Sequence, residues 1–272
     1  MINIQIKLNT TCSIYKITKG GAKELMNGIF AAFCEKPFAF GTFRECYLGY
    51  ILDKNKRFIK TSEFPLGKCV VKKNKKDCSL IENVKDFLSS YVSEYFAKEF
   101  NNFIKIPNKI NFICPYSTFD KISNQFMYVE PFLEGNYIKF SSNTGYENEN
   151  FRAIIPAFSH YTWIRSKGQT IVVDVQGIFV NNKYYLTDPA IQSIDNQFGG
   201  SDLGAMGLMK FVICHKHNDI CKNWKWIPNQ FIGALNVLNC ASIKRTSFAF
   251  EHSKNILKYK PLYLALIKKI FG

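Results

Sequence analysis

The sequence has no long apolar run, no regular cysteine spacing and no internal repeat. No segment reaches the ~18 uninterrupted apolar residues that a membrane helix requires, and the N-terminal stretch MINIQIKLN alternates apolar and polar residues instead of forming the apolar run of a signal peptide. Most of the nine cysteines have apolar neighbours, which favours a reducing compartment over a disulfide framework. These absences predict a cytoplasmic protein without a transmembrane segment.

Acidic residues are scarce relative to basic ones. The 272 residues include 21 Asp and Glu against 36 Lys and Arg, a formal net charge of +15. A surface of that charge attracts anions such as nucleotides, nucleic acid or acidic lipids. The hydrophobic fraction of 47% and the aromatic fraction of 15% exclude a disordered chain. The chain is long enough to bury its own core as one large domain or as two lobes.

Hydrophobic patterning predicts an α+β fold with two lobes. Strand and turn patterns extend to about residue 75, and a helix follows from residue 80, where Ser79 and Glu82 form an S-x-x-E capping box. Strands resume near 111–116 and 125–135. The polar segment 141–151 marks the boundary between a sheet-rich N-lobe of about residues 1–140 and a C-lobe of about 141–272. Further helices are predicted near 153–166, 203–216, 229–242 and 248–270.

A predicted hairpin at 170–189 carries the first candidate site. If residues 181–183 form its turn, Gln176 lies opposite Asp188. Asp174 shares a strand face with Gln176, because side chains two apart point the same way. Two carboxylates and an amide oxygen at one end of a hairpin are the hard-oxygen ligands that Mg²⁺ prefers. In the alternative interpretation, Asp188 only opens a turn and Asp174 is a solvated strand residue.

Three residues of the first half have the chemistry to contact a nucleotide. Lys72 ends the apolar run CVVK, so a strand would hold its ammonium near a phosphate, although a plain solvated lysine fits the same pattern. Gly41 would let the backbone approach phosphates, or it simply forms a turn. Glu130 ends a strand before a proline where the two lobes should meet, and by itself it has no assigned role.

Several short motifs follow one another along the chain: GTFREC, CVVK, VEPFLEGNYIKF, AFSHYTW, VVDVQG, LTDP, GGSDLG and HKHNDIC. This ordered series resembles the alpha-kinases, a family of atypical protein kinases. The resemblance covers roughly residues 38 to 228, and several motifs in the right order are far more specific than any one of them. The H-R-D, D-F-G and G-x-G-x-x-G signatures of ordinary protein kinases are absent, which fits this family.

The resemblance implies a role for each matching residue. Lys72 would contact the ATP phosphates and Glu130 the adenine at the lobe junction, while Asp174 would act on the substrate hydroxyl. Gln176 and Asp188 would hold magnesium. Further family positions lie near the nucleotide (Gly41, Arg44 and Lys139) or in a glycine-rich loop at 199–207 that is associated with substrate binding (Gly199, Gly200, Asp202 and Gly204).

The resemblance also implies a structural zinc ion in the C-lobe, held by His160, His215, His217 and Cys221. Helical spacing places His215 on one inward face with Leu208, Phe211 and Val212. Four protein ligands would close the tetrahedron and leave no position for water. His217 stands where the family has cysteine, and the alternative is that His217 faces solvent while Cys214 binds the metal.

Together these features predict a serine/threonine protein kinase of the alpha-kinase type that uses ATP, Mg²⁺ and a structural Zn²⁺ and acts on a protein substrate. We expect Lys72→Ala and Asp174→Ala to abolish phosphotransfer and leave the fold intact. One alternative is a weakly active pseudokinase, because Asp202 replaces a family asparagine and adds negative charge near the phosphates. A second is a basic, zinc-stabilised nucleic-acid binder, which no nucleic-acid motif supports. The segment 258–272 is expected to be a final packed helix rather than a membrane-surface helix.

Overall fold

The computed structural model describes residues 8–17, 23–76, 80–120, 125–143, 147–151, 153–194 and 196–225. Two compact units divide the chain: one holds residues up to Val84 together with Ile113–Glu134, and the other holds Lys85–Phe112 and the residues from Gly135 onwards. The predicted lobe boundary near residue 141 is close to Gly135, where the chain passes from the first unit into the second for the last time. No sequence pattern, however, predicts that residues 85–112 belong to the second unit. The helices expected at 229–242 and 248–270 lie outside the described residues.

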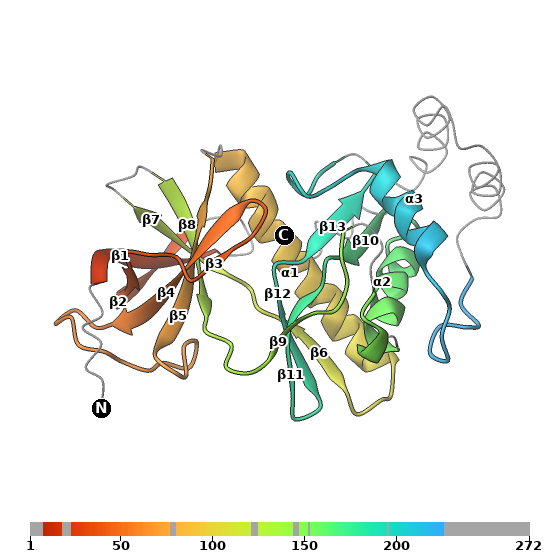
Figure 1. Ribbon diagram of the computed structural model, residues 1–272, viewed down its shortest axis with the longest axis horizontal. Helices are drawn as coiled ribbons and strands as arrows, with labels where there is room; N and C mark the ends of the chain where they lie inside the picture. Colours follow the sequence, from red (N-terminus) through yellow and green to blue (C-terminus); the bar gives the residue numbers. More distant parts are fainter. Residues whose placement is uncertain are drawn as a thin grey trace. The chain divides into compact units, whose positions relative to one another are not determined.

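The first unit is an antiparallel sheet of seven strands in the order β2-β1-β7-β8-β5-β4-β3. Strand β2 also pairs with β4, so the sheet closes on itself (Figure 1). This pairing covers strand edges of β2 and β4, while β3 pairs only with β4. The strands are β1 (Leu8–Ile17), β2 (Lys23–Cys34), β3 (Ala39–Phe40), β4 (Arg44–Leu52), β5 (Lys68–Asn74), β7 (Tyr116–Asp120) and β8 (Gln125–Pro131).

Alternation along β5 gives this sheet one apolar and one polar face. Cys69 and Val71 are fully buried in a cluster with Met127 and Val129 of β8. Lys72 and its neighbours two residues away point to the opposite face, because successive side chains alternate. The register Lys72↔Tyr128 between β5 and β8 fixes which residues surround that lysine.

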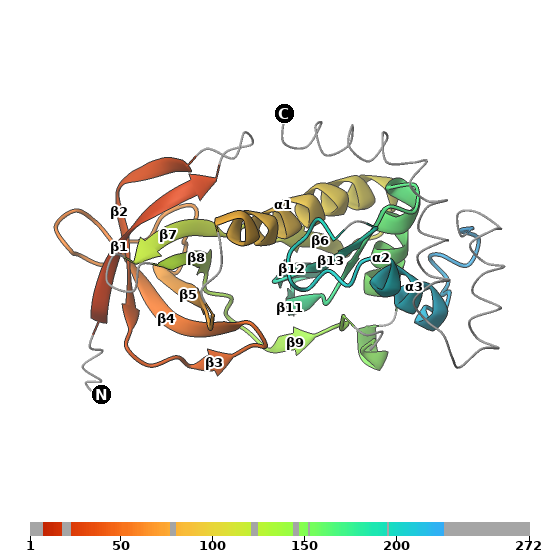
Figure 2. The same cartoon turned by 90° about the horizontal axis from the view of Figure 1, so that it is seen from above.

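The second unit contains a four-stranded sheet of order β6-β12-β11-β9 and a separate strand pair, β10-β13. Helix α2 packs on β10, and α3 packs on β13 and β10 (Figures 1 and 2). Its elements are α1 from Lys85 onwards (the whole helix is Leu80–Phe103), β6 (Lys109–Phe112), β9 (Tyr137–Lys139), the 3-10 turn η1 (Glu149–Phe151), α2 (Ile154–Arg165), β10 (Thr170–Val173), β11 (Gln176–Val180), β12 (Lys183–Thr187), β13 (Ala190–Ser193) and α3 (Ala205–Cys214).

The helices begin and end close to where the sequence predicts. Helix α1 begins at Leu80, although Ser79 of its expected capping box lies outside the described residues. Helix α2 is apolar on all sides, and ten of its twelve residues are buried, as expected for a helix in the centre of a core. Among the described residues, no helix combines the length and the apolar character needed to cross a membrane.

The register predicted for the hairpin was wrong by one residue. Asn181 and Asn182 have φ of 50° and 58°, so they alone form a tight two-residue turn. Val180 therefore pairs with Lys183, and Gln176 pairs with Thr187 instead of Asp188. The hairpin is also interrupted, because β10 pairs with β13 in a different sheet. Asp174 thus precedes β11 and does not share a strand with Gln176.

Candidate functional site

In the first unit, Lys72 and Glu130 form a buried ion pair. The Lys72 Nζ lies 2.7 Å from the Glu130 Oε2, and each residue is 4% exposed. Strand pairing explains the contact, since Val70 is opposite Glu130 and Lys72 is its diagonal neighbour. The possibility that Lys72 is a solvated lysine is therefore excluded. The resemblance implies separate nucleotide contacts for the two residues, whereas here the carboxylate binds the ammonium directly.

The same face of the first sheet carries Arg44. Its guanidinium lies 4.5 Å from the ring centroid of Tyr128, within cation–π range, and its Nε is 3.4 Å from the Asn74 Oδ1. The register pairs Arg44 with Asn74 and Lys72 with Tyr128, so these contacts follow from strand alignment. Gly41 closes the turn before β4 by donating its N–H to the Arg44 carbonyl at 2.8 Å. The face therefore combines two cations with a buried carboxylate.

In the second unit, Asp174 lies in the first of two breaks in the hairpin. Val173 pairs with Ala190, and Gln176 pairs with Thr187, so the breaks at 174–175 and 188–189 lie opposite each other. Asp174 has φ of 55° and Asp188 has φ of 51°, a left-handed conformation that aspartate tolerates better than most residues. The backbone register thus places residues 174 and 188 in facing breaks and not on one alternating strand, and the convergence of their carboxylates stays a prediction.

Strand β9 supports the first break. The Lys139 Nζ lies 2.8 Å from the Asp174 Oδ1, and Lys139 pairs with Gln176 across β9 and β11. The neighbouring Val175 donates its N–H to the Ser141 Oγ at 3.0 Å and accepts two backbone N–H groups from residues 140–141. These bonds hold the backbone around Asp174. The structure therefore brings Lys139, Asp174, Gln176 and Asp188 to one region of the second unit.

The glycine-rich loop leads from β13 into α3. Gly199 and Gly204 have φ of 80° and 65°, and a Cβ on either would lie under 3.0 Å from a neighbouring oxygen. Glycine is therefore required at both positions. Gly200 is different, because a Cβ there would meet nothing within 4 Å. The loop has the tight backbone that its composition predicts.

The carboxylate of Asp202 is turned into its own loop. It is 6% exposed and accepts hydrogen bonds from the N–H groups of Ser193, Phe198 and Gly204 and from the Ser193 hydroxyl. Burial raises the pKa of Asp202, and these four bonds oppose that rise. The charge is therefore engaged inside the loop. The pseudokinase alternative rested on a negative charge that repels the phosphates, whereas here four hydrogen bonds engage the charge of Asp202.

His160, His215, His217 and Cys221 form a cluster whose potential ligand atoms all lie within 4.8 Å of one another. The imidazole centroids are 5.0–5.3 Å apart, and the Cys221 Sγ lies 3.5 Å from the His215 Nε2. Bond lengths of ~2.0–2.3 Å to one tetrahedral ion imply ligand atoms roughly 3.3–3.8 Å apart. Burial, then the neighbouring histidines, lowers the pKa of His160 to about 3, which keeps this imidazole neutral for metal binding. The donor set therefore fits a metal ion.

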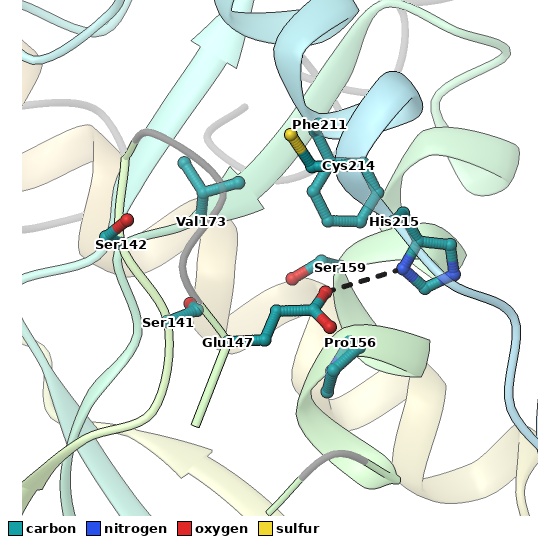
Figure 3. Close-up of a pocket in the computed structure, with 9 residues that line it drawn as sticks. All are labelled: Ser141, Ser142, Glu147, Pro156, Ser159, Val173, Phe211, Cys214 and His215. Atoms are coloured by element: carbon teal, nitrogen blue, oxygen red, sulfur yellow. Dashed lines mark ion pairs between the residues drawn. The ribbon is translucent and has the colours of Figure 1, made fainter. Parts of the chain in front are cut away.

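Contacts around the cluster orient its members. His217 places Nδ1 2.9 Å from the Cys221 carbonyl oxygen, which leaves Nε2 for a metal. The His215 Nδ1 lies 3.6 Å from the Glu147 Oε1 across a small pocket that Cys214 also lines (Figure 3). A carboxylate behind a histidine is a common support for a metal ligand. Sequence reasoning missed Glu147, since it belongs to a polar segment without a motif.

The position of His215 differs in detail from the prediction. It is the C-cap of α3, with ψ of 125°, and no longer belongs to the helix. It is nevertheless buried, and its ring stacks on Phe211 with centroids 5.0 Å apart, as the helical spacing indicated. His217 and Cys214 are both exposed, but the cluster contains His217 and not Cys214. The alternative ligand set is therefore not supported.

Residues 39–221 match the model of the alpha-kinase family. Alpha-protein kinase vwkA of Dictyostelium discoideum is 35% identical over 193 residues, which cover 68% of this chain and 30% of that protein. Eukaryotic elongation factor 2 kinase of Homo sapiens is 30% identical over 198 residues, covering 71% and 26%. The chain thus spans less than a third of the length of these curated relatives.

Solved structures show the same fold. The alpha-kinase domain of myosin-II heavy chain kinase A in complex with AMP-PNP is 27% identical and gives a TM-score of 0.64, covering 78% of this chain and 93% of that chain. An alpha kinase from Entamoeba histolytica gives a TM-score of 0.67 at 24% identity, covering 80% and 92%. The second likeness concerns the fold alone.

Proposed function

Because the chain belongs to the alpha-kinase family, we propose that it transfers the γ-phosphoryl group of ATP to serine or threonine hydroxyls of a protein. The observation that carries this proposal is the pair of facing breaks in the hairpin, with Asp174 in one and Asp188 in the other, within the segment matched by the family. A cytoplasmic setting belongs to the proposal, because none of the seven described cysteines forms a disulfide.

Asp174 is the group that we assign to the acceptor hydroxyl. Its side chain is about a quarter exposed, and Lys139 holds one of its oxygens. A carboxylate in this position orients the hydroxyl and accepts its proton. Catalysis in this reaction depends mainly on positioning, so the hydrogen bonds that fix Val175 contribute to it.

Lys72 is assigned to the phosphates of ATP, and Glu130 to the orientation of Lys72. An ammonium has three donors, and the bond to Glu130 uses one of them. An ammonium suits phosphate oxygens, for which lysine acts as a point charge. Gln176 and Asp188 would hold the magnesium ion, which neutralises charge that develops on the transferred group. Their oxygen donors fit this hard cation.

The cluster of three histidines and Cys221 is assigned to a structural zinc ion. Three imidazoles and one thiolate supply four ligands, which leaves no open coordination position and therefore no catalytic water. The ligands come from α2, from the end of α3 and from the turn that follows. A metal there ties the helix that follows the glycine-rich loop to the core of the second unit.

Phosphotransfer with and without Mg²⁺ tests the proposal. Purified protein is incubated with ATP and casein, and phosphorylated residues are identified by mass spectrometry. We expect Mg²⁺-dependent phosphoserine or phosphothreonine with wild-type protein and none with Asp174→Asn. Asp53→Asn is the matched control, because Asn keeps the oxygen that accepts the N–H groups of Asn55 and Arg57. Equal activity of Asp174→Asn and wild type would exclude the assigned role.

A further inference from the structure

We propose that Gln192 is a positioning residue for the protein substrate, because its amide fixes the conformation of the glycine-rich loop at 199–204. The inference rests on the proposed function for its link to substrate. The contacts that define it are independent of that function. Gln192 lies on β13, is fully buried, and matches no motif in the sequence.

The amide of Gln192 is bonded to the loop at two points. Its Oε1 accepts the N–H of Leu203 at 2.6 Å, and its Nε2 donates to the carbonyl of Ser201 at 3.0 Å and to the side-chain oxygen of Asn143. Asn143 in turn donates its Nδ2 to the same Ser201 carbonyl at 2.8 Å. A buried amide with both its oxygen and its nitrogen bonded to backbone allows one loop conformation.

Helix α3 provides space for this amide. Gly207 is buried, and a Cβ built on it would lie 1.9 Å from the Gln192 Oε1 and 2.5 Å from its Cδ. Glycine is the poorest former of helix interiors apart from proline, so a glycine in the first turn of a ten-residue helix needs a reason. The reason is the Gln192 side chain, which occupies the space that a Cβ at residue 207 would need. The two positions are therefore mutually dependent.

The strand that carries Gln192 also leads to the assigned catalytic residue. Gln192 pairs with Ile171 on β10, and Ala190 pairs with Val173, after which Asp174 follows. Two residues along a strand span roughly 6.6 Å. The β10-β13 strand pair therefore leads into Asp174 at its end and carries Gln192, which binds the loop, two residues further along. The amide fixes the loop relative to Asp174, and this would set where a bound substrate presents its hydroxyl.

The first test uses Gln192→Glu, which keeps the acceptor for Leu203 but turns a carboxylate oxygen toward the Ser201 carbonyl. We expect the KM for casein to rise about tenfold or more, with the KM for ATP unchanged, because a loop misplaced by about 1 Å is enough for such losses. Hydrogen exchange of residues 199–204 should become faster. Asn101→Asp is the matched control: that amide also bonds a backbone N–H and a backbone carbonyl, both of Ile110, far from the loop in sequence.

The second test examines the fit of Gly207 to the amide. Gly207→Ala should raise the KM for casein as Gln192→Glu does, because the methyl displaces the amide. On a Gln192→Ala background, which empties the space, Gly207→Ala should add nothing. Additive effects of the two substitutions would overturn the inferred dependence.

The outcomes distinguish a failure of the role inferred for Gln192 from a failure of the kinase assignment. Slow exchange at 199–204 in wild type that is lost in Gln192→Glu, with a raised KM for casein only, supports the inference. Unchanged KM values despite faster exchange would overturn the positioning role while leaving the kinase activity standing. Fast hydrogen exchange of residues 199–204 in wild type would overturn the inference that the Gln192 amide fixes the loop. Absence of any phosphotransfer by wild type would refute the proposed function and, with it, the substrate role of Gln192.

Discussion

Replacing Lys72 by alanine should destabilise the protein as well as inactivate it. The substitution leaves the Glu130 carboxylate, which is 4% exposed, without the ammonium that lies 2.7 Å away. Removing one partner of a buried ion pair costs about 3–5 kcal/mol, a large part of the ~5–15 kcal/mol that stabilises a typical domain. The expectation from the sequence that Lys72→Ala leaves the fold intact therefore has to be corrected.

Urea unfolding and a neutral double variant separate the two effects. Lys72→Met combined with Glu130→Gln removes both charges, so it should recover at least about 2 kcal/mol of the stability that Lys72→Ala loses. Phosphotransfer should remain absent, because no ammonium is left for the phosphates. Lys139→Ala serves as the control, since the ion pair that it breaks is half-exposed on the lysine side and worth only about 0–1 kcal/mol.

Two results would refute this reasoning. If Lys72→Ala unfolds within about 0.5 kcal/mol of wild type, the pair is not buried as described. If the neutral double variant keeps wild-type phosphotransfer, Lys72 does not contact the phosphates, whatever it contributes to the first unit.

Three further predictions concern the second unit. His217→Ala should lose the bound zinc and lower the Tm, because only three ligands remain; full zinc content by elemental analysis would contradict the ligand set. Asp202→Asn should lower the free energy of unfolding by about 1–3 kcal/mol and not raise activity, because only the amide oxygen of asparagine can accept hydrogen bonds and its NH₂ would face donors; unchanged urea stability would count against this. Asn182→Gly should raise stability by about 0.5 kcal/mol, because φ is 58° there; a lower Tm would exclude the two-residue turn.

Periodicity was sufficient to predict the helices and most strands, but not the course of the hairpin. The spacing of apolar residues in α1, α2 and α3 depends on one helix at a time, so local sequence determines it. The register of β11 and β12 depends on whether residues 181–182 or residues 181–183 form the turn. Two consecutive asparagines are compatible with both turn lengths. The breaks at Asp174 and Asp188 result from β10 and β13 joining a different sheet, which is a tertiary event.

The site residues were predictable where a motif carried them and were missed where only packing does. The metal cluster contains the four residues inferred from the resemblance, because histidines are few and their spacing is specific. The pairing of Lys72 with Glu130 required the alignment of β5 and β8, which joins residues 58 positions apart. Gln192 and Glu147 act through contacts with distant backbone or side chains, and an isolated glutamine in AIQS gives no sequence signal.

Transfer of ³²P from γ-labelled ATP to casein, by wild type and by Asp174→Ala in the presence of Mg²⁺, tests the central claim most directly. Asp174 is partly exposed and belongs to no apolar cluster of the described chain, so its replacement should leave the Tm near that of wild type. We predict labelled casein with wild type and a loss of at least about a hundredfold with Asp174→Ala, the scale expected for a residue that accepts the proton. Equal labelling by both proteins, or none by wild type at any Mg²⁺ concentration, would contradict the assignment of this chain as an active kinase.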